Sequence, residues 1–116
     1  MLAALYVNGV SALLPVMNNT KWREIQEAMY GLQNSPQWRT RCVTNGYVSN
    51  WDGEWFYHFS EGGFIDIEWV EIKAESDEQS KIVLSSLKSI HVPGIKTENG
   101  FKVFGYVREG ESIDYL

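Results

Sequence analysis

The chain has 116 residues, 44% of them hydrophobic and 22% charged, a balance typical of one soluble globular domain. Its single cysteine, Cys42, cannot form an intramolecular disulfide, so we expect a reducing, cytoplasmic location. The formal net charge is −5, and residues 52–78 alone carry nine acidic residues against one Lys, or −8, which leaves +3 elsewhere. A region this acidic is unsuited to a phosphate backbone. We therefore expect a basic protein partner and no nucleic acid.

The first sixteen residues, MLAALYVNGVSALLPV, are apolar, but we do not expect them to form a signal peptide or a membrane span. No Lys or Arg precedes them, Asn8-Gly9 interrupts them, and the run is too short to cross a bilayer. Residues 1–16 are interpreted as either an apolar arm or an extension upstream of a start at Met17. An arm of this kind offers a contact for a homodimer. Residues 17–116 are predicted to form a single domain.

The elements of this domain follow the order α-β-β-β-α-β-β. The fold class is therefore α+β, an antiparallel sheet with two helices packed on it, and the strand over 101–108 is predicted to be central. Caps, apolar spacing and turn residues give the bounds. In chain order the predicted elements are a helix from Asn19-Thr20 to the Asn34-Pro36 breaker, strands over 40–50, 54–59 and 64–73, a helix from Ser76 to Pro93, and strands over 101–108 and 112–116.

The stretch SNWDGEWFYHF (49–59) is predicted to be a hairpin with a two-residue turn at Asp52-Gly53. Opposed residues then share a face. The face interpreted as core carries Tyr47, Ser49, Phe56, His58, Ile65, Ile67 and Trp69. The other face mixes aromatic rings with carboxylates and suits a basic side chain of a partner, unless a helix or the arm covers it. The candidate binding residues there are Asn50, Trp55, Tyr57, Asp66 and Glu68, flanked by Asp52 and Glu54.

An alternative hypothesis is enzymatic. Glu71-Ile72-Lys73 at the end of a strand, with Asp52 upstream, resembles the PD-(D/E)xK nuclease pattern. The resemblance implies a Mg²⁺ ion held by Asp52 and Glu71, with Lys73 helping to activate the attacking water. The element order agrees, and the predicted register places Asp52 opposite Glu71. The negative charge of the region and the simpler role of Asp52 in an Asp-Gly turn count against it.

Five separate runs of the chain together resemble a known family. They are MNNTKWREIQEAMY (17–30), PQWRTR (36–41), GYVSNWDGEWFYHF (46–59), IEWVEIK (67–73) and FKVFGYV (101–107). The family they resemble consists of small bacterial proteins and is catalogued only as a domain of unknown function. The resemblance covers about residues 17–116 and implies no activity, cofactor or catalytic residue. The favoured hypothesis is therefore a non-enzymatic binding module, for example an immunity-like protein from a mobile gene context that masks a basic toxin.

Overall fold

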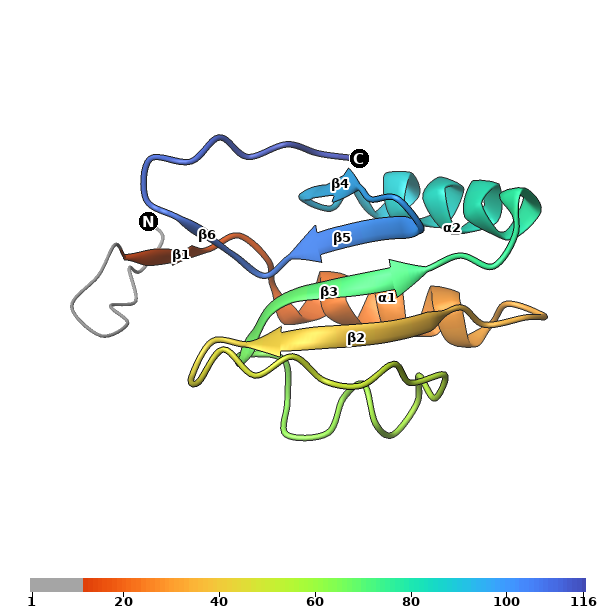
Figure 1. Cartoon of the computed structure of the whole chain (residues 1–116), viewed down its shortest axis with the longest axis horizontal. Coiled ribbons are helices and arrows are strands. Elements are labelled where there is room, and N and C mark those ends of the chain that lie inside the picture. The colour runs from red at the N-terminus through yellow and green to blue at the C-terminus, as the bar shows by residue number, and fades with distance from the viewer. Residues whose placement is uncertain (1–11) are drawn as a thin grey trace.

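The computed structural model describes residues 12–116, and Figure 1 shows its two helices behind an antiparallel sheet. The predicted α+β class is confirmed. Strands β2, β3, β5 and β4 form the main sheet in that order, and β1 pairs with β6 in a separate two-stranded ribbon. The elements are β1 (Leu13–Pro15), α1 (Asn19–Tyr30), β2 (Gln37–Cys42), β3 (Ile67–Lys73), α2 (Asp77–Ile90), β4 (Gly94–Lys96), β5 (Gly100–Phe104) and β6 (Tyr106–Arg108).

Part of the predicted N-terminal arm can be placed. Residues 13–15 form β1, which pairs antiparallel with β6. Residues 1–11 lie outside the described part of the chain, and so does the homodimer contact predicted for them. Within residues 12–116, no helix is long and apolar enough to cross a membrane.

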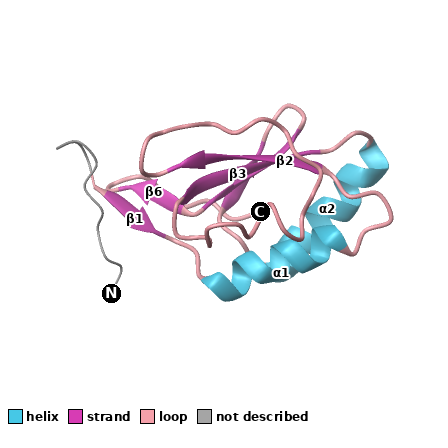
Figure 2. Cartoon of the chain, turned by 90° about the horizontal axis from the view of Figure 1, so that it is seen from below, coloured by secondary structure: helices cyan, strands magenta, loops and turns pink. Residues whose placement is uncertain are grey.

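Both helices pack on one face of the main sheet, as Figure 2 shows from below. Ser76 caps α2 as predicted, and its hydroxyl accepts a hydrogen bond from the Gln79 N–H. The cap of α1 is Asn18, one residue before the predicted pair, and its side chain accepts from the Lys21 N–H at 2.8 Å. The core between the layers combines buried aromatic side chains with buried aliphatic ones, among them Trp22, Ile25, Met29, Val70, Ile72, Val83, Leu87, Phe101 and Val103.

The strand predicted over 101–108 is divided at Gly105 into β5 and β6. A side chain at Gly105 would overlap the Ile67 carbonyl oxygen and contact the Trp22 ring, so only glycine permits this approach. The Gly105 N–H donates to the Glu68 carbonyl at 2.8 Å. As predicted, β5 is central, because it pairs with β3 on one side and β4 on the other.

The predicted hairpin at Asp52-Gly53 is wrong. No strand covers 54–59, and residues 47–52 instead fold back along the outer edge of β2. Asp52 and Trp38 exchange two backbone hydrogen bonds of 2.8 Å. Gly53 does not have a positive φ, which a type I′ turn requires. The Asp52 carboxylate accepts from the Glu54 N–H at 2.8 Å, so the side chain makes a local turn instead.

Residues 55–61 form consecutive turns that carry two aromatic side chains into the core. Trp55 is 1% exposed, and its ring centroid lies 4.8 Å from that of Phe59, four residues later. The Trp55 indole N–H donates to the Pro36 carbonyl at 2.8 Å. A spacing of four belongs to a helical turn, so the two faces inferred from strand alternation are wrong. Phe56, His58, Tyr47 and Ile65, predicted to be core, are exposed, whereas Ile67 is buried as predicted.

Candidate functional site

Three exposed aromatic side chains touch one another where α1 meets the loop after Asp52. Tyr30, Phe56 and Tyr57 are 58%, 50% and 73% exposed. The ring centroids of Tyr30 and Phe56 are 5.4 Å apart, and those of Phe56 and Tyr57 are 4.7 Å apart. Large apolar groups that are both exposed and contiguous commonly mark interaction sites on soluble proteins. We call these three residues the aromatic ridge.

The backbone under the aromatic ridge is fixed by one carboxylate. The Glu54 side chain accepts hydrogen bonds from the backbone N–H groups of Phe56, Tyr57 and His58, at 3.0, 2.7 and 2.7 Å. These bonds, first of all the one from the His58 N–H, lower the pKa of Glu54 below its ordinary value. Glu54 therefore satisfies the backbone N–H groups of residues 56–58, which in a β-hairpin would bond to the neighbouring strand.

Helix α1 holds the same loop from the carbonyl side. The Gln26 side-chain amide donates to the carbonyls of Trp55 and Phe56 at 2.9 and 2.8 Å. The Ser60 hydroxyl donates to the Phe56 carbonyl as well, at 2.9 Å. Buried Trp55 and Phe59 anchor the loop on either side of the exposed rings. Phe56 and Tyr57 are thus presented to solvent on a backbone that is already ordered.

An Asp–His pair lies beside the aromatic ridge. The Asp52 carboxylate and the His58 Nδ1 are 2.8 Å apart. The hydrogen bond and the negative charge of Asp52 raise the pKa of the exposed His58. Partial burial opposes ionisation of Asp52, but hydrogen bonds from Glu54 and His58 outweigh it and lower the pKa of the Asp52 carboxyl.

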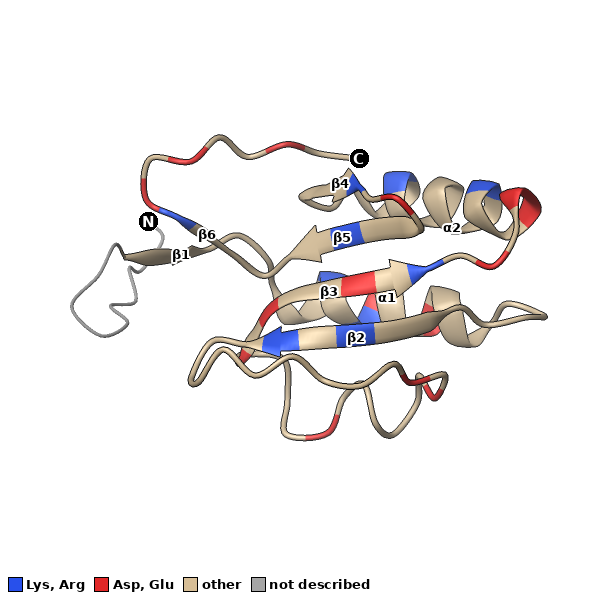
Figure 3. Ribbon diagram, in the orientation of Figure 1, with Lys and Arg blue, Asp and Glu red and all other residues tan. Residues whose placement is uncertain are grey.

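The surroundings of the aromatic ridge are acidic. No Lys or Arg occurs between Arg41 and Lys73, and Figure 3 shows only acidic bands on the loops along the outer edge of β2. Exposed Glu61 lies on the same loop. On α1, exposed Glu27 precedes Tyr30 by about one turn and exposed Arg23 precedes it by about two turns. A positively charged molecule is therefore favoured at this end of the protein.

The structure does not bring the five predicted binding residues onto one face. Trp55 is in the core, so of the two possibilities for its face, open or covered, the structure shows this residue covered. The Glu68 carboxylate pairs with Arg41 at 3.3 Å. Tyr57 and Asn50 are exposed, and their role in binding stays a prediction.

The remaining predicted binding residue, Asp66, has a local partner. Its carboxylate accepts from the Thr44 hydroxyl at 2.6 Å and from the Thr44 N–H at 2.9 Å. The hydroxyl bond is the main cause that lowers the pKa of Asp66. Nearby Cys42 has a raised pKa, because of burial first and the Asp66 charge second, and is therefore not an activated nucleophile.

The residues of the nuclease hypothesis are also separated. Asp52 pairs with Trp38, whereas Glu71 pairs with Arg39, so the two carboxylates project from opposite faces of the sheet. The predicted register that placed Asp52 opposite Glu71 is therefore wrong. Arg39 binds Glu71 at 2.8 Å, and the Lys73 ammonium lies 4.6 Å from the Trp51 ring centroid. Within residues 12–116, no group of three or more His, Cys, Asp or Glu side chains could hold a metal ion.

Sequence reasoning missed two of the three residues of the aromatic ridge. Phe56 was interpreted as core, and Tyr30 was given no role. The spacing of four between Trp55 and Phe59 was the available signal, because it indicates a helical turn and leaves Phe56 and Tyr57 outside. Glu54 immediately before that turn was the second signal, since carboxylates bind free N–H groups at such positions.

The model of a family of unknown function, DUF6678, matches residues 6–110. The resemblance to a family without assigned activity is thereby confirmed, and the match begins eleven residues before Met17. No curated protein and no solved structure matches the chain.

Proposed function

The chain belongs to DUF6678, a family of unknown function, and we propose that it acts as a non-enzymatic binding module for a basic protein. The contact surface is the aromatic ridge of Tyr30, Phe56 and Tyr57. The observation that carries this proposal is the combination of three rings that are each at least half exposed with a backbone held by Glu54 and Gln26. Rings of this kind contribute most of the free energy of many protein interfaces.

The backbone that carries Phe56 and Tyr57 is already ordered in the free protein, and this supports a binding role for the two rings. A flexible loop must lose side-chain and backbone entropy when it binds, which weakens the complex. Here the bonds to Glu54 and Gln26 impose that order within the free protein. Phe56 also packs against both neighbouring tyrosines, so its ring already has two fixed contacts.

The negative charge near the aromatic ridge supports a basic partner. Glu61 and the Asp52–His58 pair lie on the loop that carries Phe56 and Tyr57, and the segment from Cys42 to Ile72 contains no Lys or Arg. Complementary charge increases association rates and excludes acidic partners. Arg side chains of a partner can also stack on exposed Tyr and Phe rings. Neutralisation of a basic toxin by an immunity-like protein is one biological form of this activity.

The proposal is tested by affinity capture with the full chain, followed by rebinding of the purified captured protein. We expect a basic protein whose Kd rises at least about 30-fold in Phe56→Ala and in Tyr57→Ala, as for hot-spot residues of 2 kcal/mol or more. The matched control is Ile82→Ala, which removes a side chain of similar exposure, 45%, from α2. An unchanged Kd in both ridge variants, or an acidic captured protein, would contradict the proposal.

A further inference from the structure

The face of the main sheet opposite the helices is open and carries a regular array of side chains. On β3, Trp69, Glu71 and Lys73 alternate with buried Val70 and Ile72. No helix covers this side in Figure 1 or Figure 2. Strand pairing places Arg39 and Arg41 of β2 on the same side as these β3 residues. It also places Lys102 and Phe104 of β5 there. We call this side the open face, and the charged and aromatic residues of its strands and edge are Arg39, Arg41, Trp51, Glu68, Trp69, Glu71, Lys73, Lys102 and Phe104.

Aromatic rings and cations are stacked on one another across this open face. Trp69 pairs directly with Phe104 on the neighbouring strand, and the Lys102 ammonium lies 4.2 Å from a Trp69 ring centroid. The Arg39 guanidinium and the Lys73 ammonium each lie 4.6 Å from the Trp51 ring centroid. These rings are only partly buried, so their faces are available once a cation moves aside.

The open face is positive although the protein is acidic. Its strands carry four cations and two acids, a formal charge of +2, and Arg108, Glu111 and Asp114 at the rim bring the sum to +1, against −5 for the whole chain. Both acids are occupied, Glu71 by Arg39 and Glu68 by Arg41. In both pairs the contact joins one glutamate oxygen, Oε1, to the arginine Nε. The Nη groups of the two guanidiniums can therefore donate to another acceptor such as phosphate.

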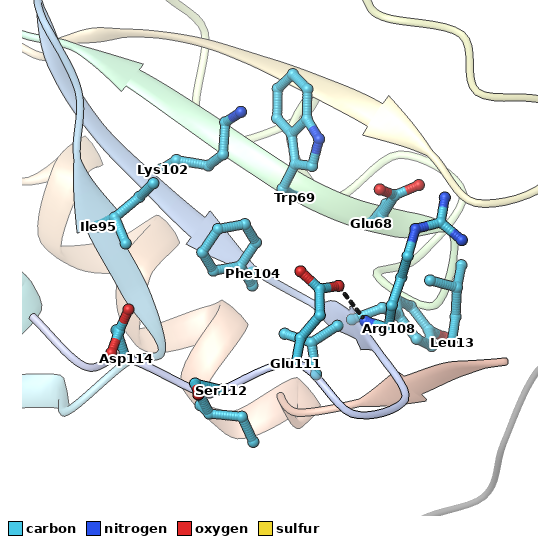
Figure 4. Close-up of a pocket in the computed structure, with 13 residues that line it drawn as sticks. Leu13, Glu68, Trp69, Ile95, Lys102, Phe104, Arg108, Glu111, Ser112 and Asp114 are labelled. Carbon is cyan, nitrogen blue, oxygen red and sulfur yellow. Dashed lines mark hydrogen bonds between the residues drawn. The ribbon is translucent and has the colours of Figure 1, made fainter. Parts of the chain in front are cut away.

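A groove runs along the β5 side of the open face. Its volume is about 400 Å³, and it lies between the sheet and the C-terminal segment after β6. Trp69, Phe104 and Lys102 line one side in Figure 4, whereas Glu111 and Asp114 line the other. Flat uncharged groups are favoured between the rings and this acidic rim, and anionic groups are favoured on the β2 side.

We propose that the open face binds single-stranded nucleic acid. Bases stack on Trp69 and Phe104, and phosphates contact the cations on β2, β3 and β5. Four-stranded sheets backed by helices bind RNA in this way, with stacking aromatic residues on the sheet surface. Here the two rings occupy β3 and β5, the central strands. A duplex hides its base faces and cannot use them.

This proposal differs from the expectation, drawn from the sequence, that nucleic acid is not a partner. That expectation used the summed charge of residues 52–78, which are consecutive in sequence but do not form one surface. Folding brings Arg39 and Arg41 from one side and Lys102 from the other next to Trp69 and Lys73. Four of the nine acids of that segment precede β3 on the loops at the outer edge of β2, and three more follow β3 at the start of α2, which leaves only Glu68 and Glu71 on β3. The linear count therefore does not describe the open face.

The experiment is fluorescence anisotropy of labelled twelve-residue oligo(U) and oligo(dT) with the full-length chain at low salt. We expect binding that weakens with salt and is tighter for single strands than for a duplex of equal length. Trp69→Ala should weaken binding at least about 5-fold, the lower end of one base–aromatic stack. Lys102→Glu should weaken it as well, and circular dichroism confirms that both variants are folded.

The matched controls lie elsewhere on the molecule. Lys81→Glu makes the same charge change on exposed α2, and Phe56→Ala removes an exposed ring from the aromatic ridge. Neither should change oligonucleotide affinity, so this test is independent of the proposed protein partner. The proposal is overturned if no binding occurs up to about 100 μM protein, if Lys81→Glu weakens binding as much as Lys102→Glu, or if poly-glutamate competes as well as unlabelled oligo(U), because ion exchange alone explains those results.

Discussion

Replacement of Trp55 by Ala distinguishes the observed fold from the hairpin that the sequence suggests. On an open hairpin face the substitution would cost little stability. In the structure, Trp55 is 1% exposed, so roughly 200 Å² of its surface is buried, worth about 5 kcal/mol by transfer at 25 cal/mol per Å². Trp→Ala substitutions in cores cost about 3–5 kcal/mol. The Pro36 carbonyl would also lose its indole donor.

Urea denaturation followed by circular dichroism at 222 nm measures this cost. With a slope of about 2 kcal/mol per molar, we expect the midpoint of Trp55→Ala to fall by about 2 M. The matched control is Phe56→Ala, the adjacent exposed ring, which should cost about 1 kcal/mol or less. Equal midpoints for the two variants, or a loss below about 1.5 kcal/mol in Trp55→Ala, would refute the burial of Trp55.

Three further predictions concern titration, backbone and metal. Asp52→Asn removes the charge that raises the pKa of His58, so an NMR titration of the His58 ring should move to lower pH; no movement would show that the pair does not form in solution. Because its folded-state pKa is raised, the His58 contribution to stability is full below about pH 6.5 and is lost as the pH rises through the raised value. Gly105→Ala should lower the melting temperature by several degrees, since its methyl group would overlap the Ile67 carbonyl, and an unchanged melting temperature would contradict the close approach. Addition of about 10 mM Mg²⁺ should shift the melting temperature by less than about 1 °C, because Asp52 and Glu71 do not share a site; a larger rise would restore the nuclease hypothesis.

The regular elements could be predicted from the sequence because their signals are local. Ser76 caps α2 through its own hydroxyl, and apolar spacing identifies both helices. The central position of β5 could be predicted because the strand carries apolar residues on both of its faces. An edge strand with one face in solvent does not require this pattern.

The candidate site could not be predicted, because it depends on where one loop obtains its hydrogen bonds. Asp52-Gly53 is a common hairpin signal, but Gly53 keeps a negative φ and the Asp52 backbone pairs with Trp38. Glu54 and Gln26 then replace the missing ladder for residues 55–58. Because the observed turn at Asp52-Gly53 differs from the predicted hairpin turn, the side chains that follow it do not alternate between two faces as predicted. Trp55 is therefore buried and Phe56 exposed, whereas the prediction placed Phe56 on the core face and Trp55 on the other. Distant contacts such as Gln26 with Trp55 leave no local pattern in the chain.

The most direct test of the binding module is site-specific photo-crosslinking in the host cells. A photoreactive phenylalanine replaces Tyr57 in one protein and Ile82 in another; both positions are exposed, but only Tyr57 belongs to the aromatic ridge. We predict one predominant adduct from position 57, with a basic protein identified by mass spectrometry, and no such adduct from position 82. Identical adducts from both positions, or none from position 57, would contradict the central claim.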